Sequence, residues 1–126
     1  MIVCVTEKPS VAESIAKVLG AKTSNEGYYE GNGYQVTWAF GHLCELKAPY
    51  EYNSNWFNWN LDTFPMLPDK FGIKLIDDKG IKEQFSIIKK LCKKAEIIIN
   101  CGDAGQEGEV FQRWIYQLIG VTCPIK

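Results

Sequence analysis

Positive charge is scarce for a protein that would bind nucleic acid unaided. Arginine occurs once, at position 113, and the formal net charge of the 126 residues is -1. Affinity for nucleic acid comes mainly from neutralising phosphates, so this balance argues against a free-standing nucleic-acid binder. It still allows a catalytic module whose nucleic-acid contacts lie on other domains.

Long apolar runs and cysteine pairs are also missing. The longest apolar runs are a few residues, far short of a membrane span. Glu7 and Lys8 interrupt the first of these runs, so we expect no signal sequence. The five cysteines include no CxxC pair, which predicts reduced thiols in a cytoplasmic protein and argues against a disulfide framework or a zinc site.

Local signals predict a first strand and helix. Residues 2–5 form a short, β-rich apolar run, as expected of a buried parallel strand. Pro9 suits the first helical position, and Gly20 can end the helix. Ser10 and Glu13 have the spacing of a capping box.

Two different patterns follow this helix. Residues 28–30 and 34–40 flank Gly-Asn-Gly at 31–33, which is a strong hairpin signal. Residues 45–72 show no clean period, and loops of that length in compact domains are usually functional. We interpret them as a long ordered excursion anchored by aromatic residues: Trp56, Phe57, Trp59, Phe64 and Phe71.

The rest of the chain predicts helix, strand and helix. An amphipathic helix over 79–95 precedes an apolar strand over 97–100, and a last helix ends at Gly120. The last helix has an apolar stripe of Val110, Phe111, Trp114, Ile115 and Leu118. This order predicts an α/β fold with an open, mainly parallel, Rossmann-like sheet, helices on both faces, a hairpin and a long aromatic-rich insertion. No repeat or linker divides it, so we expect one domain over residues 1–126.

Two of the predicted strands end in acidic residues. The strand 97–100 runs into residues 103–109, which are rich in acids and glycine, and Glu7 follows the strand 2–5. Singly, Glu7 could be a solvated loop acid, Asp103 a helix cap, and Glu107 a first-turn acid that favours the helix dipole. Open α/β sheets, however, place their chemistry at the carboxyl edge, where these acids would meet.

Three carboxylates in one place predict a cation site. Two carboxylates about 4 Å apart repel by roughly 4 kcal/mol at an effective dielectric of 20. Oxygen ligands favour Mg²⁺, bound through one or two carboxylates with water and phosphate. The hypothesis depends on the tips of the first and last long strands lying side by side.

Other polar and aromatic residues are less decisive. Lys8 fits an ordinary surface lysine as well as an ammonium placed beside a phosphate. His42 is the only histidine, and its residue type alone favours a packing role. Trp59 is favoured as an anchor of the excursion over a platform for base stacking.

Four motifs occur in an order that resembles a known family. They are Glu-Lys-Pro-Ser at 7–10, Gly-His-Leu at 41–43, Trp-Asn-Leu at 59–61 and the acidic turn at 103–109. Together they resemble the N-terminal Toprim domain of bacterial type IA DNA topoisomerases, closest to topoisomerase III. The resemblance spans essentially the whole chain, and the first motif combined with the acidic turn is quite specific.

The resemblance implies that this chain is one part of an Mg²⁺-dependent enzyme that cuts, passes and reseals single-stranded DNA. A tyrosine on a downstream domain would form the 5′-phosphotyrosine, so we expect the present chain alone to be inactive. The parent enzyme would be cytoplasmic and associated with the nucleoid.

Family roles carry over to matching positions. By resemblance, Glu7 transfers a proton at the 3′ oxygen and Lys8 steadies the phosphate charge. Asp103 and Glu107 match metal-holding acids, with Glu7 close to the same ion. His42 and Trp59 match positions expected to contact DNA.

The chain departs from the family pattern at two positions. The familiar acidic turn is Asp-x-Asp-Arg-Glu-Gly-Glu, whereas this chain has Gly105 and Gln106 in place of the second aspartate and the arginine. The missing carboxylate is expected to weaken or reshape the metal site. The missing arginine removes a positive charge that could pair with an acid or a phosphate.

Two other functions remain open. A Toprim nuclease or primase module would use metal-activated water and would need no partner tyrosine. A non-catalytic receiver-like α/β module would need an acidic pair after the first strand, where only Glu7 is present. A glycine-rich phosphate loop of the Walker type is absent from the sequence.

Overall fold

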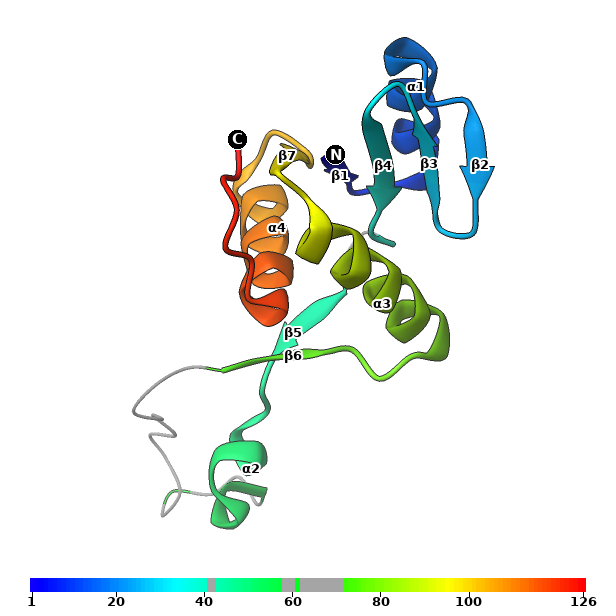
Figure 1. The fold of residues 1–126 in the computed structure, drawn as a ribbon. Coiled ribbons are helices and arrows are strands. Elements are labelled where there is room, and N and C mark those ends of the chain that lie inside the picture. Colours follow the sequence, from blue (N-terminus) through cyan, green and yellow to red (C-terminus); the bar gives the residue numbers. More distant parts are fainter. Residues whose placement is uncertain (41–42, 58–60, 62–71) are drawn as a thin grey trace.

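A five-stranded sheet forms the body of the molecule. The computed structural model describes residues 1–40, 43–57, 61 and 72–126. The strand order is β2-β3-β4-β1-β7 (Figure 1). The strands are β1 (Ile2–Thr6), β2 (Thr23–Asn25), β3 (Tyr28–Gly31), β4 (Tyr34–Trp38) and β7 (Ile97–Cys101). β1 pairs in parallel with β4 and β7, while β2 and β3 continue the sheet in antiparallel pairing.

Helices cover both faces of the sheet, which confirms the predicted α/β architecture. α1 (Pro9–Leu19) packs on one face, and α3 (Lys79–Lys94) and α4 (Gln106–Ile119) pack on the other. Because side chains alternate along a strand, β1 contributes to both cores. Cys4 packs with the α1 core, and Val3 and Val5 pack with the α3–α4 core. This two-sided burial explains why β1 is apolar at nearly every position.

α1 begins and ends at the predicted residues, but its cap differs. Pro9 is the first helical residue, and Gly20 ends the helix with a left-handed φ of 78°. The N-cap is Lys8, which makes no side-chain capping bond, so the capping box predicted from Ser10 and Glu13 is wrong. Pro9 starts the helix one residue before Ser10, which places that serine inside the first turn.

The buried face of α4 agrees with the predicted stripe only in part. Ile115 is buried, and Trp114 and Leu118 pack partly buried against the core, as predicted. The structure buries Gly108, Gln112, Ile115, Tyr116 and Ile119, whereas Val110 is 40% exposed. Because Gln112 is polar, the sequence pattern alone does not place it on the buried face of α4. Its Nε2 donates to the Val5 carbonyl, which satisfies the buried amide.

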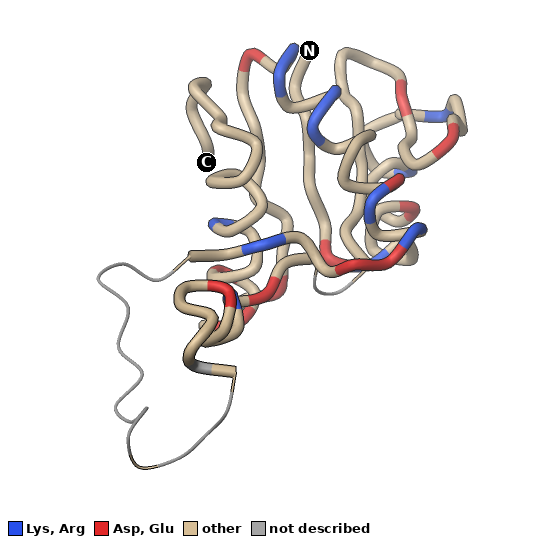
Figure 2. The backbone as a smooth tube through the Cα atoms, turned by 90° about the horizontal axis from the view of Figure 1, so that it is seen from below, with Lys and Arg blue, Asp and Glu red and all other residues tan. Residues whose placement is uncertain are grey.

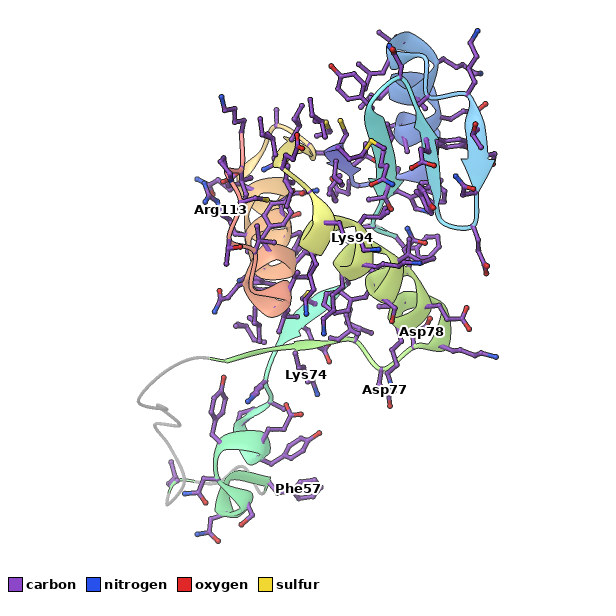
Figure 3. All side chains as sticks on the ribbon, viewed as in Figure 1. Phe57, Lys74, Asp77, Asp78, Lys94 and Arg113 are labelled. Atoms are coloured by element: carbon purple, nitrogen blue, oxygen red, sulfur yellow. The ribbon has the colours of Figure 1, made fainter. Side chains whose placement is uncertain are left out.

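The excursion after the hairpin is only partly as predicted. β5 (Cys44–Leu46) pairs with β6 (Ile73–Leu75), and α2 (Pro49–Tyr52) and the short 3-10 helix η1 (Ser54–Phe57) project from this small sheet (Figure 1). Phe57 is 69% exposed and packs edge-on against Tyr50, so its predicted anchoring role is wrong (Figure 3). Trp59, Phe64 and Phe71 lie outside the described residues.

The last described residues cover the outer edge of β7. The Ile98 amide donates to the Pro124 carbonyl and the Lys126 amide donates to the Ile98 carbonyl, as in a short parallel ladder. Among the helices that the structure describes, none is long and apolar enough to cross a membrane. Acidic and basic residues are interspersed along the described backbone, in agreement with the small net charge (Figure 2).

Candidate acidic site at the carboxyl edge of the sheet

β1 and β7 are neighbours, as the cation-site hypothesis requires. They pair in parallel with Thr6 opposite Cys101, so both chains leave the sheet at the same edge. Glu7 and the acidic turn, which follows Gly102, therefore emerge side by side. The predicted adjacency of these two strand tips is confirmed.

Glu7 is the most perturbed acid at this edge. Burial raises the pKa of its carboxyl, and the side chain of Asp103 raises that pKa further. The Asp103 backbone amide and the Lys8 charge oppose this shift more weakly. Glu7 Oε2 is buried and has no hydrogen-bond partner among the described residues. A buried carboxylate oxygen without a donor is costly, and a cation or a proton would relieve that cost.

An open pocket of about 420 Å³ lies over this pair. It is lined by Glu7 and by residues 103–108. The α4 N-terminus also faces the pocket, since residues 105–108 line it. The N-cap of α4 is Gly105, and not Asp103, and Gly105 has no side chain to cap the helix. Free amides and the helix dipole at such an end favour a bound anion.

The acid pair fits a cation that also binds water and phosphate. In the described part of the chain, no group of three or more His, Cys, Asp or Glu side chains forms a complete metal cluster. Glu107 lines the same pocket but does not join Glu7 and Asp103 in such a cluster. Two carboxylates with open space beside them suit Mg²⁺, which usually keeps several waters.

The other predicted site residues are placed less fully. Lys8 is exposed at the start of α1, and its charge acts on Glu7. His42 and Trp59 lie outside the described residues, so their predicted DNA contacts stay predictions.

Polar residues that sequence reasoning missed hold the acidic turn in place. Asn100 accepts from the Gly102 amide at 3.0 Å and donates to Glu109 at 3.2 Å. Glu109 in turn pairs with Arg113 at 2.7 Å. Gln112 is buried and ties α4 to β1, one residue before Thr6. Its spacing from Ile115 and Ile119 is helical, which is the signal that could have found it.

Thr6 shapes the turn that carries Glu7. Its side chain is fully buried, and its hydroxyl lies 3.0 Å from the Lys8 carbonyl and 3.2 Å from the Thr37 carbonyl. We expect Thr6→Val to keep the packing but to cost about 1 kcal/mol of unfolding free energy, because the hydroxyl bond is lost. Urea denaturation measures this cost. Thr23→Val on the exposed edge strand is the control, and equal costs for the two variants would contradict this role.

The sequence of this chain matches one protein family and several known proteins. A family model described as "Toprim domain" matches residues 2–125. The chain is 43% identical over 126 residues to DNA topoisomerase 3 of Bacillus thuringiensis, covering 98% of this chain and 17% of that protein. It is 40% identical over 122 residues to DNA topoisomerase 3 of Shouchella clausii, covering 95% of this chain and 16% of that protein. The chain thus spans about a sixth of the length of these relatives.

Proposed function

Since this chain belongs to the Toprim domain family and resembles domains of proteins named DNA topoisomerase 3, we propose that it is the Mg²⁺-binding domain of a type IA DNA topoisomerase. The parent enzyme would cut, pass and reseal single-stranded DNA through a tyrosine outside residues 1–126. Its remaining domains would provide most of the DNA contacts, in the cytoplasm at the nucleoid.

One observation carries this proposal. Glu7 and Asp103 come together from neighbouring parallel strands, and Glu7 Oε2 is buried without a partner among the described residues. If these two acids had only a structural role, a hydrogen-bond donor from the protein would be expected at Glu7 Oε2. If they bind a cation next to a phosphate, Glu7 Oε2 is expected to have no donor from the protein.

The residues of the chain suggest how each would act. Asp103 would hold Mg²⁺ with Glu7 close to the same ion, and Glu107, which lines the same pocket without joining their cluster, would reach the ion through bound water. Bound Mg²⁺ would supply charge neutralisation at the transferring phosphoryl group. In the proposed cleavage step the tyrosine hydroxyl would lose its proton to solvent as its oxygen bonds to phosphorus. The bond from phosphorus to the 3′ oxygen would break, and that oxygen would take a proton from the Glu7 carboxyl. Resealing would reverse each of these transfers. Without a bound ion, burial and the Asp103 side chain raise the pKa of Glu7, which favours a carboxyl that carries a proton. A group that gives a proton on cleavage must accept it again on resealing. Lys8 and the α4 N-terminus would stabilise the phosphate charge.

Removing either acid tests the metal site. We expect Mg²⁺ to shift the amide resonances of residues 103–108 in the wild-type chain, and Asp103→Asn or Glu7→Gln to weaken Mg²⁺ binding about tenfold. Glu13→Gln, which removes an exposed acid from α1, is the control. Mg²⁺ shifts that persist unchanged in both acid variants would refute the proposed site.

The same Glu7→Gln variant predicts a dependence of stability on pH. A carboxyl whose pKa is raised by folding stabilises the fold below its unfolded pKa, and this contribution is lost as pH rises through the folded pKa. Glu7→Gln should therefore be more stable than wild type at neutral pH in the absence of Mg²⁺. Its advantage should shrink as pH falls toward 4, roughly where a free glutamate titrates. Thermal melts at several pH values measure this difference.

Activity assays separate the proposal from its main rival. The 126-residue chain should relax no supercoiled DNA, because the proposed nucleophile lies elsewhere. Metal-dependent nicking by the pure chain, lost in Glu7→Gln, would instead indicate a Toprim nuclease that uses metal-activated water.

A further inference from the structure

A second pocket lies between the β2–β3 turn and α3. Its volume is about 310 Å³, near the lower limit for small-molecule sites. It is lined by Asn25, Glu26, Tyr28, Ile87, Lys90 and Leu91. None of these residues lines the acidic pocket, so the two pockets are separate in the part of the chain that the structure describes.

Two polar groups at this pocket, on Asn25 and Lys90, have no partner in the described part of the chain. Asn25 Nδ2 is buried and has no hydrogen-bond partner among the described residues. Lys90 is exposed, and no described acid pairs with it, whereas Lys82 on the same helix pairs with Asp77 at 2.5 Å. Native folds usually satisfy a buried amide, so an unsatisfied amide on a residue that lines a pocket indicates a missing partner.

The apolar side chains line this pocket from two elements, α3 and β3. Ile87 and Leu91 are one helical turn apart on α3, and Tyr28 faces them from the start of β3. The turn approaches α3 closely, since a Cβ on Gly27 would lie 2.5 Å from Ile87 Cδ1. An aromatic ring opposite two aliphatic side chains suits a flat apolar ring, and the amide and ammonium suit its polar edge and an attached anion.

The sheet register places this pocket at the same edge as the acidic site. Tyr28 pairs with Thr37, Thr37 with Val5, and Val5 with Asn100, so these residues form one row across four strands. Glu7 lies two residues beyond Val5 along the chain, just past the end of β1. Two inter-strand spacings separate β3 from β1, roughly 10 Å. A single nucleic-acid strand held at Glu7 could reach this pocket with a nearby nucleotide.

We propose that the pocket between the β2–β3 turn and α3 binds one nucleotide unit, with the base between Tyr28 and the Ile87–Leu91 wall. Asn25 binds the polar edge of the base, which its amide can do as both donor and acceptor. Glu26 accepts from an exocyclic amine on the rim, and Lys90 binds the phosphate. As part of the single-stranded DNA substrate, this unit rests on the proposed function.

NMR titration of the 126-residue chain tests the pocket directly. Short single-stranded DNA should shift the amide resonances of Asn25, Tyr28 and Leu91. Lys90→Ala should weaken this binding about tenfold, as expected for loss of a charge-assisted bond. Lys89→Ala is the matched control, because it removes an equal charge from the neighbouring exposed position and should change affinity less than about twofold. Asn25→Ala should weaken the binding as Lys90→Ala does.

Two ligands and one acid variant distinguish a site for a DNA strand from a site for a free nucleotide, and the pocket from the metal site. Deoxyadenosine monophosphate that binds as tightly as the oligonucleotide would identify a free-nucleotide site, and tighter binding of the oligonucleotide supports a substrate strand. Equal losses in Lys90→Ala and Lys89→Ala, or no shift at Asn25, Tyr28 and Leu91, would overturn the pocket. The Asp103→Asn chain should still bind DNA here. DNA shifts in the pocket without any Mg²⁺ response at residues 103–108 would refute the proposed metal site alone.

Discussion

Replacing Gly108 with alanine is expected to destabilise the domain by about 3 kcal/mol and to eliminate its response to Mg²⁺. A Cβ at this position would lie 2.3 Å from the Asp103 carbonyl oxygen and 3.2 Å from the Asp103 amide nitrogen. Both obstacles are backbone atoms, so the turn must move as a whole. Because Asp103 belongs to that turn, its carboxylate would move away from Glu7. Urea unfolding and an Mg²⁺ titration followed by NMR measure the two effects.

Gly105→Ala is the matched control for this variant. Gly105 is three residues earlier in the same turn, and nothing lies within 4 Å of the Cβ that alanine would add. Its backbone is extended, with a φ of -157°, which alanine also adopts. We expect a loss of no more than about 0.5 kcal/mol and an unchanged Mg²⁺ response. If the two alanine variants behaved alike, the contact between α4 and the acidic turn would not position Asp103.

The elements that the sequence predicts well are those with strong local signals. Pro9 and Gly20 mark both ends of α1, and the Gly-Asn-Gly turn marks the hairpin. The amphipathic pattern predicts α3, and the apolar run predicts β7. Because the carboxyl ends of parallel strands share an edge, the nearness of Glu7 and Asp103 could also be inferred.

The elements that the sequence does not predict depend on contacts far along the chain. β2 is the polar segment Thr23–Asn25, which has no strand pattern and forms only by pairing with β3. Gln84 reads as a surface residue of α3, yet it is buried and donates to the carbonyls of Gly27 and Trp38. Gln112 holds β1 in the same way. A buried polar residue is recognised only when its distant partner is known.

These contacts explain why the acid motif alone does not define the site. The motif gives the carboxylates, but their separation is set by Gln112, Asn100 and Thr6, which fix the ends of β1 and β7. The position of the site residues thus depends on hydrogen bonds made by residues outside the acidic pocket. Its chemistry should be sensitive to substitutions that never contact the metal or the phosphate.

Introducing an acid at Gly105 is expected to strengthen Mg²⁺ binding about tenfold. Gly105 lines the acidic pocket, and the open space at its Cβ position admits a side chain without displacing any neighbour within 4 Å. Gly105→Asp would therefore add a third carboxylate to Glu7 and Asp103, as in the family's usual turn. Without Mg²⁺ the added charge should lower the melting temperature, because the carboxylates repel, and Mg²⁺ should reverse this loss. Isothermal titration calorimetry and melts with and without Mg²⁺ measure both effects.

Gly105→Asn separates charge from helix capping. Gly105 is the N-cap of α4, and asparagine and aspartate cap a helix almost equally well. Any gain in stability common to both variants therefore comes from capping. Only the aspartate variant should gain Mg²⁺ affinity, since only it adds a negative ligand. If asparagine tightened Mg²⁺ binding as much as aspartate, or if neither did, the cation would not lie beside Gly105, and the ligand set around Glu7 and Asp103 would have to be placed differently.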